Sequence, residues 1–234
     1  MLQIKNIRKK YDNNIILDNI TVDIDKGNIV GVVGANGAGK TTLLSIIATV
    51  MEEYDGELVY DNYLVKKSLK KTRKNIGYVP QQATLFEELT VNDNIKFWSL
   101  QQDKEYIDRL IYIFELEGNL NKRVKNLSGG TKNRVNILIG ILNKPNLIIL
   151  DEPLVGVSLS IKRKFFKLIK EFSEEGKIVL ISSHELWELE VICSHILVIK
   201  DCKLQSFRTM EESMRICDEN NIKFWDYICN EGGL

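Results

Sequence analysis

Alternating apolar and polar positions open the chain and predict an antiparallel β layer. The alternation runs over residues 2–8 and again over residues 15–24, as in half-buried strands, with a turn at Asp12, Asn13 and Asn14. A β-branched run at 28–33 then ends at a glycine-rich segment, and residues 40–50 have the length and apolar content of a helix. We therefore expect a strand, a glycine-rich loop and a helix in succession.

Short aliphatic runs without alternation mark the second half of the chain. Residues 147–150, 178–181 and 196–199 form such runs, which are typical of strands buried on both faces. Helices are predicted between them, at 160–172 and 185–192. Strands that alternate with helices predict an α/β fold with a mostly parallel sheet covered on both sides.

The middle of the chain changes from strands to helices. Residues 57–60 and 75–79 are further strand candidates, and we interpret the basic segment 66–74 between them as a solvated face or loop. Residues 91–142 are helical in pattern. Four apolar residues of this part are spaced for one helix face, namely Ile107, Leu110, Ile111 and Phe114. We expect a helical subdomain at about 84–142, inserted in a single domain that spans 1–234 and ends in a tail at about 208–234.

Composition narrows the candidate partners. The chain has 234 residues with 32 Lys and Arg against 32 Asp and Glu, so it lacks the broad positive field of non-specific nucleic-acid binding. Its longest aliphatic stretches fall far short of the roughly 20 apolar residues that span a bilayer. The first ten residues resemble a strand and not a secretory signal. The four cysteines have no metal-ligand spacing, namely Cys193, Cys202, Cys217 and Cys229. We expect no nucleic-acid partner, a cytoplasmic location and membrane contact only through a partner.

The strongest chemical signal is the phosphate-loop pattern G-x-x-x-x-G-K-[ST] between the predicted strand and helix. It is formed by Gly34, Ala35, Asn36, Gly37, Ala38, Gly39, Lys40 and Thr41, with Thr42 next. The glycines let several backbone N–H groups point at a β-phosphate, and Lys40 neutralises the β- and γ-phosphates. Thr41 places its hydroxyl on Mg²⁺. This pattern predicts ATP and Mg²⁺ as ligands.

A pair of acids follows one of the buried strands. Residues 147–150 run directly into Asp151 and Glu152, which places both carboxylates at the carboxyl edge of the sheet. There Asp151 can hold Mg²⁺, and Glu152 can orient and polarise the water that attacks the γ-phosphate. Together with the phosphate loop, this pair still allows any P-loop NTPase, including GTPases, DNA motors and kinases.

A third motif narrows the class. Leu127, Ser128, Gly129 and Gly130 precede a predicted helix at 131–142, and such a helix start is either a simple N-cap or a second anion-binding site in this chain. The segment 127–130 resembles the signature motif of the ABC (ATP-binding-cassette) ATPase family, and it lies just upstream of the acid-bearing strand, as in that family. The resemblance extends to about Phe207. It implies a P-loop NTPase (RecA-like) core with an N-terminal antiparallel β layer.

Three further residues take expected roles from this resemblance. Tyr11 resembles the aromatic residue that stacks on adenine, although a tyrosine packed at a strand end is the alternative. Gln81 resembles the family's lid glutamine, which touches Mg²⁺ and the attacking water, with Gln82 as an adjacent alternative. His184 follows a buried strand and resembles the switch histidine at the γ-phosphate, which makes Lys40, Gln81, Glu152 and His184 the expected catalytic set. His195 is expected to be structural.

The resemblance also implies partners. Each ATP would lie between the phosphate loop of one chain and the segment Ser128, Gly129 and Gly130 of a second copy or a homologous chain. A separate transmembrane permease would complete the assembly and hold the chain at the inner face of the membrane. Segment 84–97, with Phe86, Phe97 and Trp98, is the candidate docking surface, although these aromatics could instead be core. The resemblance is greatest to the branch of the family that exports drugs, peptides or lipids. The tail, with Phe224, Trp225 and Tyr227, could pack as a last helix or contact a partner.

Two departures from the family pattern bear on the mechanism. Ser158 stands where the family usually has an aspartate that crosses to the other subunit, and Thr131 stands where glutamine normally follows the signature. Neither change removes a group that does the chemistry, so we expect an active hydrolase. A soluble non-transport ABC ATPase and a module that binds ATP with little hydrolysis are the alternatives.

Overall fold

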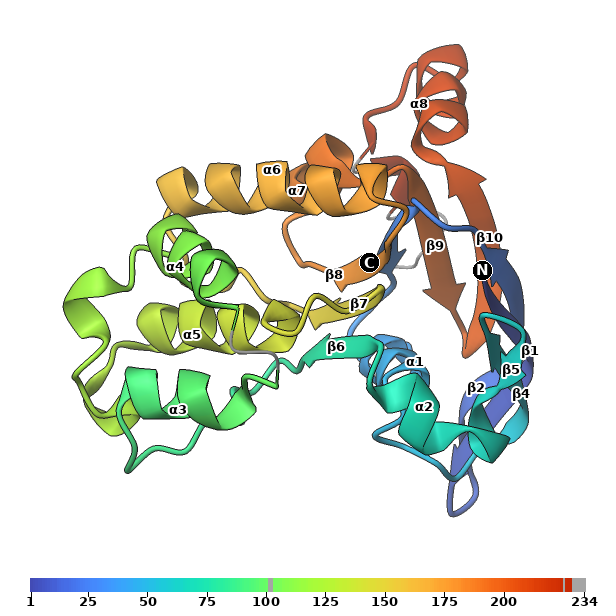
Figure 1. Ribbon diagram of the computed structural model, residues 1–234. Helices are drawn as coiled ribbons and strands as arrows, with labels where there is room; N and C mark the ends of the chain where they lie inside the picture. Colours follow the sequence, from blue (N-terminus) through green and yellow to red (C-terminus); the bar gives the residue numbers. More distant parts are fainter. Residues whose placement is uncertain (101–102, 225, 229–234) are drawn as a thin grey trace.

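Two β-sheets and the helices around them build the protein. The computed structural model describes residues 1–100, 103–224 and 226–228. One sheet has four strands in the order β2-β1-β4-β5, and the other has six in the order β10-β9-β3-β8-β7-β6. In Figure 1 the four-stranded sheet lies at one end of the molecule, and helices α3, α4 and α5 lie at the other.

The six-stranded sheet is the predicted parallel sheet. Strands β3 (Ile29–Val33), β7 (Leu147–Asp151) and β8 (Ile178–Ser182) form its centre, and every residue in them is buried. Strands β6 (Ile76–Val79) and β9 (His195–Lys200) pair with them in parallel. The α/β fold expected from the aliphatic runs is therefore confirmed.

Helices cover both faces of this sheet. Alternate residues of β7, Leu147 and Ile149, belong to a core shared with α1 (Lys40–Ile47) and the four-stranded sheet. The other two, Ile148 and Leu150, belong to the core that contains the buried side chains of α5 (Gly129–Ile141), α6 (Leu159–Glu174) and α7 (Leu186–Ile192). Both faces of the strand are thus packed, which is why its sequence shows no alternation.

The N-terminal layer is antiparallel, as predicted. Strand β1 (Leu2–Tyr11) pairs with β2 (Asn14–Ile24), with Leu2 opposite Ile24 and Tyr11 opposite Asn14. Strand β1 also pairs with β4 (Asp55–Tyr60), and β5 (Tyr63–Leu64) extends the sheet. The basic segment 66–74, expected as a solvated face or loop, has its lysines exposed but is helical in part, because residues there form η1 (Val65–Lys67) and helix α2 (Leu69–Arg73). Burial of Val65 and Thr72 anchors this short helical stretch.

The chain between β6 and β7 contains the helices predicted there. They are α3 (Val91–Trp98), α4 (Lys104–Ile113), η2 (Glu117–Asn119), η3 (Val124–Asn126) and α5. Thr90 caps α3 with a capping box to Asp93, and Asp103 caps α4. Leu110 and Phe114 are fully buried, as their helical spacing predicts.

The C-terminal part holds a strand that the sequence pattern did not indicate. Strand β10 (Lys203–Thr209) pairs antiparallel with β9, and helix α8 (Met210–Glu219) begins directly after it, before the aromatic residues of the tail. Phe224 and Tyr227 are buried, whereas Trp225 and Cys229 lie outside the described residues. Within the described chain, no helix is long and apolar enough to cross a membrane.

Candidate functional site: a phosphate-loop cavity

A cavity of about 540 Å³ opens at the carboxyl end of the parallel strands. Ligands of open α/β sheets bind at this edge. Eleven residues line it: Tyr11, Ile16, Asn36, Gly37, Gly39, Lys40, Thr41, Thr42, Gln81, Glu152 and His184. Residues from five separate parts of the sequence therefore meet around one space.

The phosphate loop joins β3 to α1. Gly39 precedes the helix with φ 102°, a left-handed conformation that glycine adopts without strain, and a Cβ there would lie 2.8 Å from the carbonyl oxygen of Ile16. The Lys40 ammonium donates to the carbonyl oxygens of Gly34 at 2.6 Å and of Ala35 at 3.0 Å. Burial lowers the pKa of Lys40, while the nearby carboxylates of Glu152 and Asp151 oppose that shift.

Asp151 is fully buried at the end of β7. Its Oδ1 accepts a 2.6 Å hydrogen bond from the Ser182 hydroxyl of the neighbouring strand β8. Its Oδ2 is buried and has no hydrogen-bond partner among the described residues. A buried carboxylate oxygen without a donor is costly unless a cation or water meets it, so this atom fits a metal ligand.

Glu152 lies at the centre of a polar cluster. Its Oε2 accepts a 2.9 Å hydrogen bond from Gln81 Nε2, and its Oε1 lies 2.7 Å from His184 Nε2. Its backbone N–H donates to Ser182 Oγ at 3.0 Å, and its φ of 50° is left-handed, which is uncommon for a residue with a side chain. Gln81 and not Gln82 lines the cavity.

Tyr11 stands at the rim of the cavity, at the end of β1. Its side chain is 47% exposed, so it is not the core tyrosine that was the alternative. The ammonium of Lys9 lies 5.0 Å from the ring centroid, and the hydroxyl contacts the sulfur of Met51 at 3.5 Å. One ring face is thus available to a flat apolar group.

The signature segment does not line this cavity. Ser128 caps α5 by accepting from the Thr131 N–H at 3.3 Å, and its hydroxyl lies 2.9 Å from the Thr131 hydroxyl. Gly130 packs so closely on the loop after β7 that a Cβ would lie 2.1 Å from the carbonyl oxygen of Gly156. Ser158 begins α6 without a side-chain cap, and its hydroxyl lies 3.1 Å from that of Ser160. Gly129 is exposed and Gly130 is half-buried, and neither lines the phosphate-loop cavity of its own chain.

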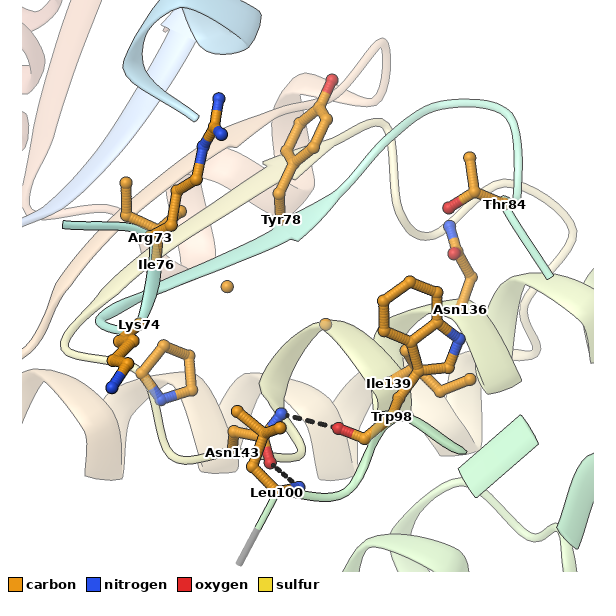
Figure 2. A pocket seen from close by; sticks show the side chains of 13 residues that line it. Arg73, Lys74, Ile76, Tyr78, Thr84, Trp98, Leu100, Asn136, Ile139 and Asn143 are labelled. Carbon is orange, nitrogen blue, oxygen red and sulfur yellow. Dashed lines mark hydrogen bonds between the residues drawn. The ribbon is translucent and has the colours of Figure 1, made fainter. Parts of the chain in front are cut away.

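The aromatic residues of the expected docking surface are exposed. Phe97 is 60% exposed, and its ring meets those of Phe86 and Trp98 edge to face, while Phe86 and Trp98 stack, with ring centroids 4.7–6.0 Å apart. The alternative that they form core is therefore wrong. Figure 2 shows Trp98 beside a pocket of about 260 Å³ that is bounded by Arg73 and Tyr78 on the β6 side and by Asn143 on the α5 side. Asn143 donates to the Trp98 carbonyl and accepts from the Leu100 N–H, which fixes this edge of the pocket.

His195 and Ser182 lie outside the set of site residues predicted from the sequence. His195 stacks on Phe207 and contacts Ser194 Oγ at 2.9 Å, outside the cavity. Ser182 contacts both acids, yet we assigned it no role from the sequence. Its position at the end of a buried strand was the available signal, and only the strand order of the sheet places this strand beside the one that carries the acids.

Comparisons with known proteins agree with the motifs. A family model described as ABC transporter matches residues 17–155. The linearmycin resistance ATP-binding protein LnrL of Bacillus subtilis (strain 168) is 32% identical over 205 residues, which are 85% of this chain and 66% of that protein. The lantibiotic transport ATP-binding protein SrtF of Streptococcus pyogenes is 32% identical over 207 residues, 87% of this chain and 89% of that protein.

Solved structures give the same result. A dimeric structure of the ATP-binding cassette MJ0796, in a post-hydrolysis state bound to ADP and Pi, is 27% identical with a TM-score of 0.80. The likeness covers 90% of this chain and 99% of that one. With a family model that matches more than half of its residues, the chain belongs to the ABC transporter family and is one of its ATP-binding subunits.

Proposed function

We propose that the chain is the motor of a transporter, which binds ATP in the phosphate-loop cavity and hydrolyses it. The observation that carries this proposal is the cluster of Gln81, Glu152 and His184 across the cavity from Lys40 and Thr41. A loop that only bound nucleotide would need no carboxylate held between an amide and an imidazole. We assign the adenine to Tyr11 and the phosphates to the segment 34–42.

The same cluster supports separate roles for its residues in hydrolysis. Glu152 has an oriented carboxylate, half-buried at the cavity wall, that can take a proton from an attacking water. Gln81 donates to one oxygen of this carboxylate and His184 contacts the other, so both neighbours fix its direction toward the cavity. We propose that His184 contacts the γ-phosphate and that Lys40 balances the charge that develops on it.

The chain offers oxygen ligands suited to Mg²⁺. Among the described residues, no group of three or more His, Cys, Asp or Glu side chains could hold a metal ion by itself. Mg²⁺ at phosphates instead takes one or two protein oxygens together with the phosphate oxygens and water. The unpartnered Oδ2 of Asp151 meets this requirement, and we propose the Thr41 hydroxyl and the Gln81 side chain as its companions. Bound there, Mg²⁺ would neutralise charge on the phosphates.

We propose that two cassettes bind two ATP head to tail. Ser128, Gly129 and Gly130 lie at a helix start, which suits a phosphate, and they lie outside their own chain's cavity. The similarity to a dimeric cassette supports this arrangement. Loss of the γ-phosphate, which both loops would hold, then opens the dimer.

Replacement of Glu152 by glutamine tests hydrolysis and dimerisation together. Glu152→Gln keeps the size of the side chain and removes its basicity, so we expect loss of ATPase activity by at least about a hundredfold. Size-exclusion chromatography in ATP and Mg²⁺ should show this variant as a dimer and the unsubstituted chain mainly as a monomer. Glu57→Gln, the same change at an exposed residue of β4 outside the cavity, serves as the control. An unsubstituted chain that binds ATP without turnover would favour the module that only binds nucleotide.

We further propose a separate transmembrane permease as the partner, with the chain on the cytoplasmic face of the membrane. The exposed cluster of Phe86, Phe97 and Trp98 beside the pocket of Figure 2 supports docking at this surface. When the chain and its permease are produced together, Trp98→Ala should lose co-purification and keep the basal ATPase activity. Tyr112→Ala, also exposed but on α4, should keep both. A chain that never associates with a membrane protein would favour a non-transport ATPase.

The direction of transport is proposed as export. The resistance and lantibiotic names of LnrL and SrtF support export of drugs, peptides or lipids. Uptake of a labelled antimicrobial peptide into inverted vesicles that hold the complex, dependent on ATP, would support this direction. Uptake only into right-side-out vesicles would contradict it.

A further inference from the structure

A buried ion pair lies beside a small cavity that Glu152 and His184 also line. Lys162, in the first turn of α6, and Glu188, in the first turn of α7, approach with Nζ and Oε1 2.6 Å apart. Their side chains are only 15% and 2% exposed. The second oxygen of Glu188 accepts a 2.6 Å hydrogen bond from the Ser183 hydroxyl. Both carboxylate oxygens therefore have partners, on two different elements of the chain.

One arm of this arrangement ends at His184. Ser183 directly precedes the histidine, and its hydroxyl also accepts from the Glu185 N–H at 3.0 Å. The residues on both sides of His184 are thus held by one hydroxyl, which is itself held by Glu188. Glu188 is thus connected through Ser183 to the backbone that carries the imidazole.

The other arm ends at the loop between Glu152 and α6. The Lys162 N–H donates to the Ser158 carbonyl at 3.0 Å, so the lysine belongs to the helical turn that ends this loop. A cavity of about 180 Å³ lies between the two arms, lined by Glu152, Gly156, Lys162, His184 and Glu188 among others. On the far side of this cavity, His184 contacts Glu152, which connects the two arms.

We infer that Glu188 is a positioning residue, which sets His184 against Glu152 through Ser183 and ties that geometry to the loop 153–158 through Lys162. This inference rests on the proposed hydrolysis. In this chain the loop has Ser158, whose hydroxyl contacts Ser160 within its own chain, so the buried pair supplies a link between the loop and the imidazole. A partner cassette that moved the loop would thereby change the position of His184.

Glu188→Gln removes the charge and keeps the shape of the side chain. We expect kcat per nucleotide site to fall about ten- to hundredfold, because small displacements of reacting groups have effects of this size. The KM for ATP should change less than about twofold, because the phosphate loop and Tyr11 are untouched. Glu190→Gln is the matched control, since Glu190 lies exposed on the same helix. Site concentration is determined by titration with a non-hydrolysable ATP analogue, so that partial unfolding cannot imitate a loss of kcat.

Substitution of Lys162, the ion-pair partner of Glu188, gives a second test. Lys162→Met should lower kcat to a similar extent, and the double variant with Glu188→Gln should lose no more than the worse single variant, because the two groups act as a unit. Losses that multiply in the double variant, or a kcat per site equal to that of Glu190→Gln, would overturn the inference while leaving the proposed ATPase in place.

The position of His184 can be monitored by NMR, without a measurement of ATPase activity. The sequence has two histidines, so His184 and His195 can be assigned in imidazole ¹H–¹⁵N spectra of the full chain with one His184→Ala variant. Glu188→Gln should shift the His184 signals and leave those of His195 unchanged. An unsubstituted chain without ATPase activity would refute the proposed function, and unmoved His184 signals in Glu188→Gln would separately refute the positioning role.

Discussion

At the scale of single residues, Ser182 connects Asp151 and Glu152. Its hydroxyl donates to Asp151 Oδ1 and accepts from the Glu152 N–H. Ser182→Ala leaves these buried groups without that partner, so we expect the free energy of unfolding to fall by about 1–3 kcal/mol. We also expect a higher Mg²⁺ concentration for half-maximal ATPase activity, because the carboxylate that would bind the ion loses its orientation.

Denaturant unfolding and a Mg²⁺ titration of the ATPase rate check this prediction. Ser160→Ala is a suitable control, since that serine is exposed at the start of α6 and its hydroxyl contacts the hydroxyl of Ser158. If Ser182→Ala and Ser160→Ala had the same Mg²⁺ dependence, Ser182 would have no part in holding the ion.

At the scale of elements, the start of α5 is packed directly on the loop that follows β7. A Cβ on Gly130 would lie 2.1 Å from the carbonyl oxygen of Gly156, whereas a Cβ on Gly129 would meet nothing within 4 Å. Gly130→Ala must therefore push the helix and the loop apart, and we expect a loss of about 1–3 kcal/mol in stability. Gly129→Ala should change stability by less than about 1 kcal/mol.

Thermal unfolding of the two alanine variants measures this difference on neighbouring positions of one helix. A lower midpoint for Gly130→Ala alone would show that the signature segment and the loop with Ser158 form one packed unit. Equal midpoints would mean that the loop adapts to a larger residue without cost, and the close approach would then have no structural role.

At the scale of the whole molecule, the phosphate loop and the signature segment belong to different nucleotide sites in the proposed dimer. Lys40→Met impairs one half of a site, and Ser128→Arg impairs the other half, so each variant alone should be inactive. Mixed in equal amounts, half of the dimers contain both chains, and each such dimer has one intact site of two in a head-to-tail pair. We therefore expect the mixture to recover up to about a quarter of the unsubstituted rate.

The measurement is the steady-state ATPase rate of each variant and of the mixture at the same total concentration. Recovery should depend on concentration, because mixed dimers form only by association. A mixture as inactive as its components would contradict the shared site, and activity of Ser128→Arg alone would place the complete site within one chain.

Much of the fold followed from local pattern. Alternation predicted β1 and β2, and unbroken aliphatic runs predicted β7, β8 and β9, because burial on one or both faces dictates these patterns residue by residue. Strand β10 was missed, since its pattern depends on the edge of a sheet that it joins only after folding. The helix at 69–73 was missed because it is short and its basic residues resemble a solvated loop.

The sequence by itself determined the phosphate loop, the acids after a buried strand and the helix start at Ser128, because each lies within a few consecutive residues whose backbone and charge act locally. The tertiary structure decided which distant residues meet. Gln81 and not Gln82 lines the cavity, and Ser182 contacts Asp151. Gly130 packs on Gly156, and Lys162 pairs with Glu188. Contacts of this kind join residues 26 to 71 positions apart, and their geometry depends on how the sheet and helices pack, which no local pattern records.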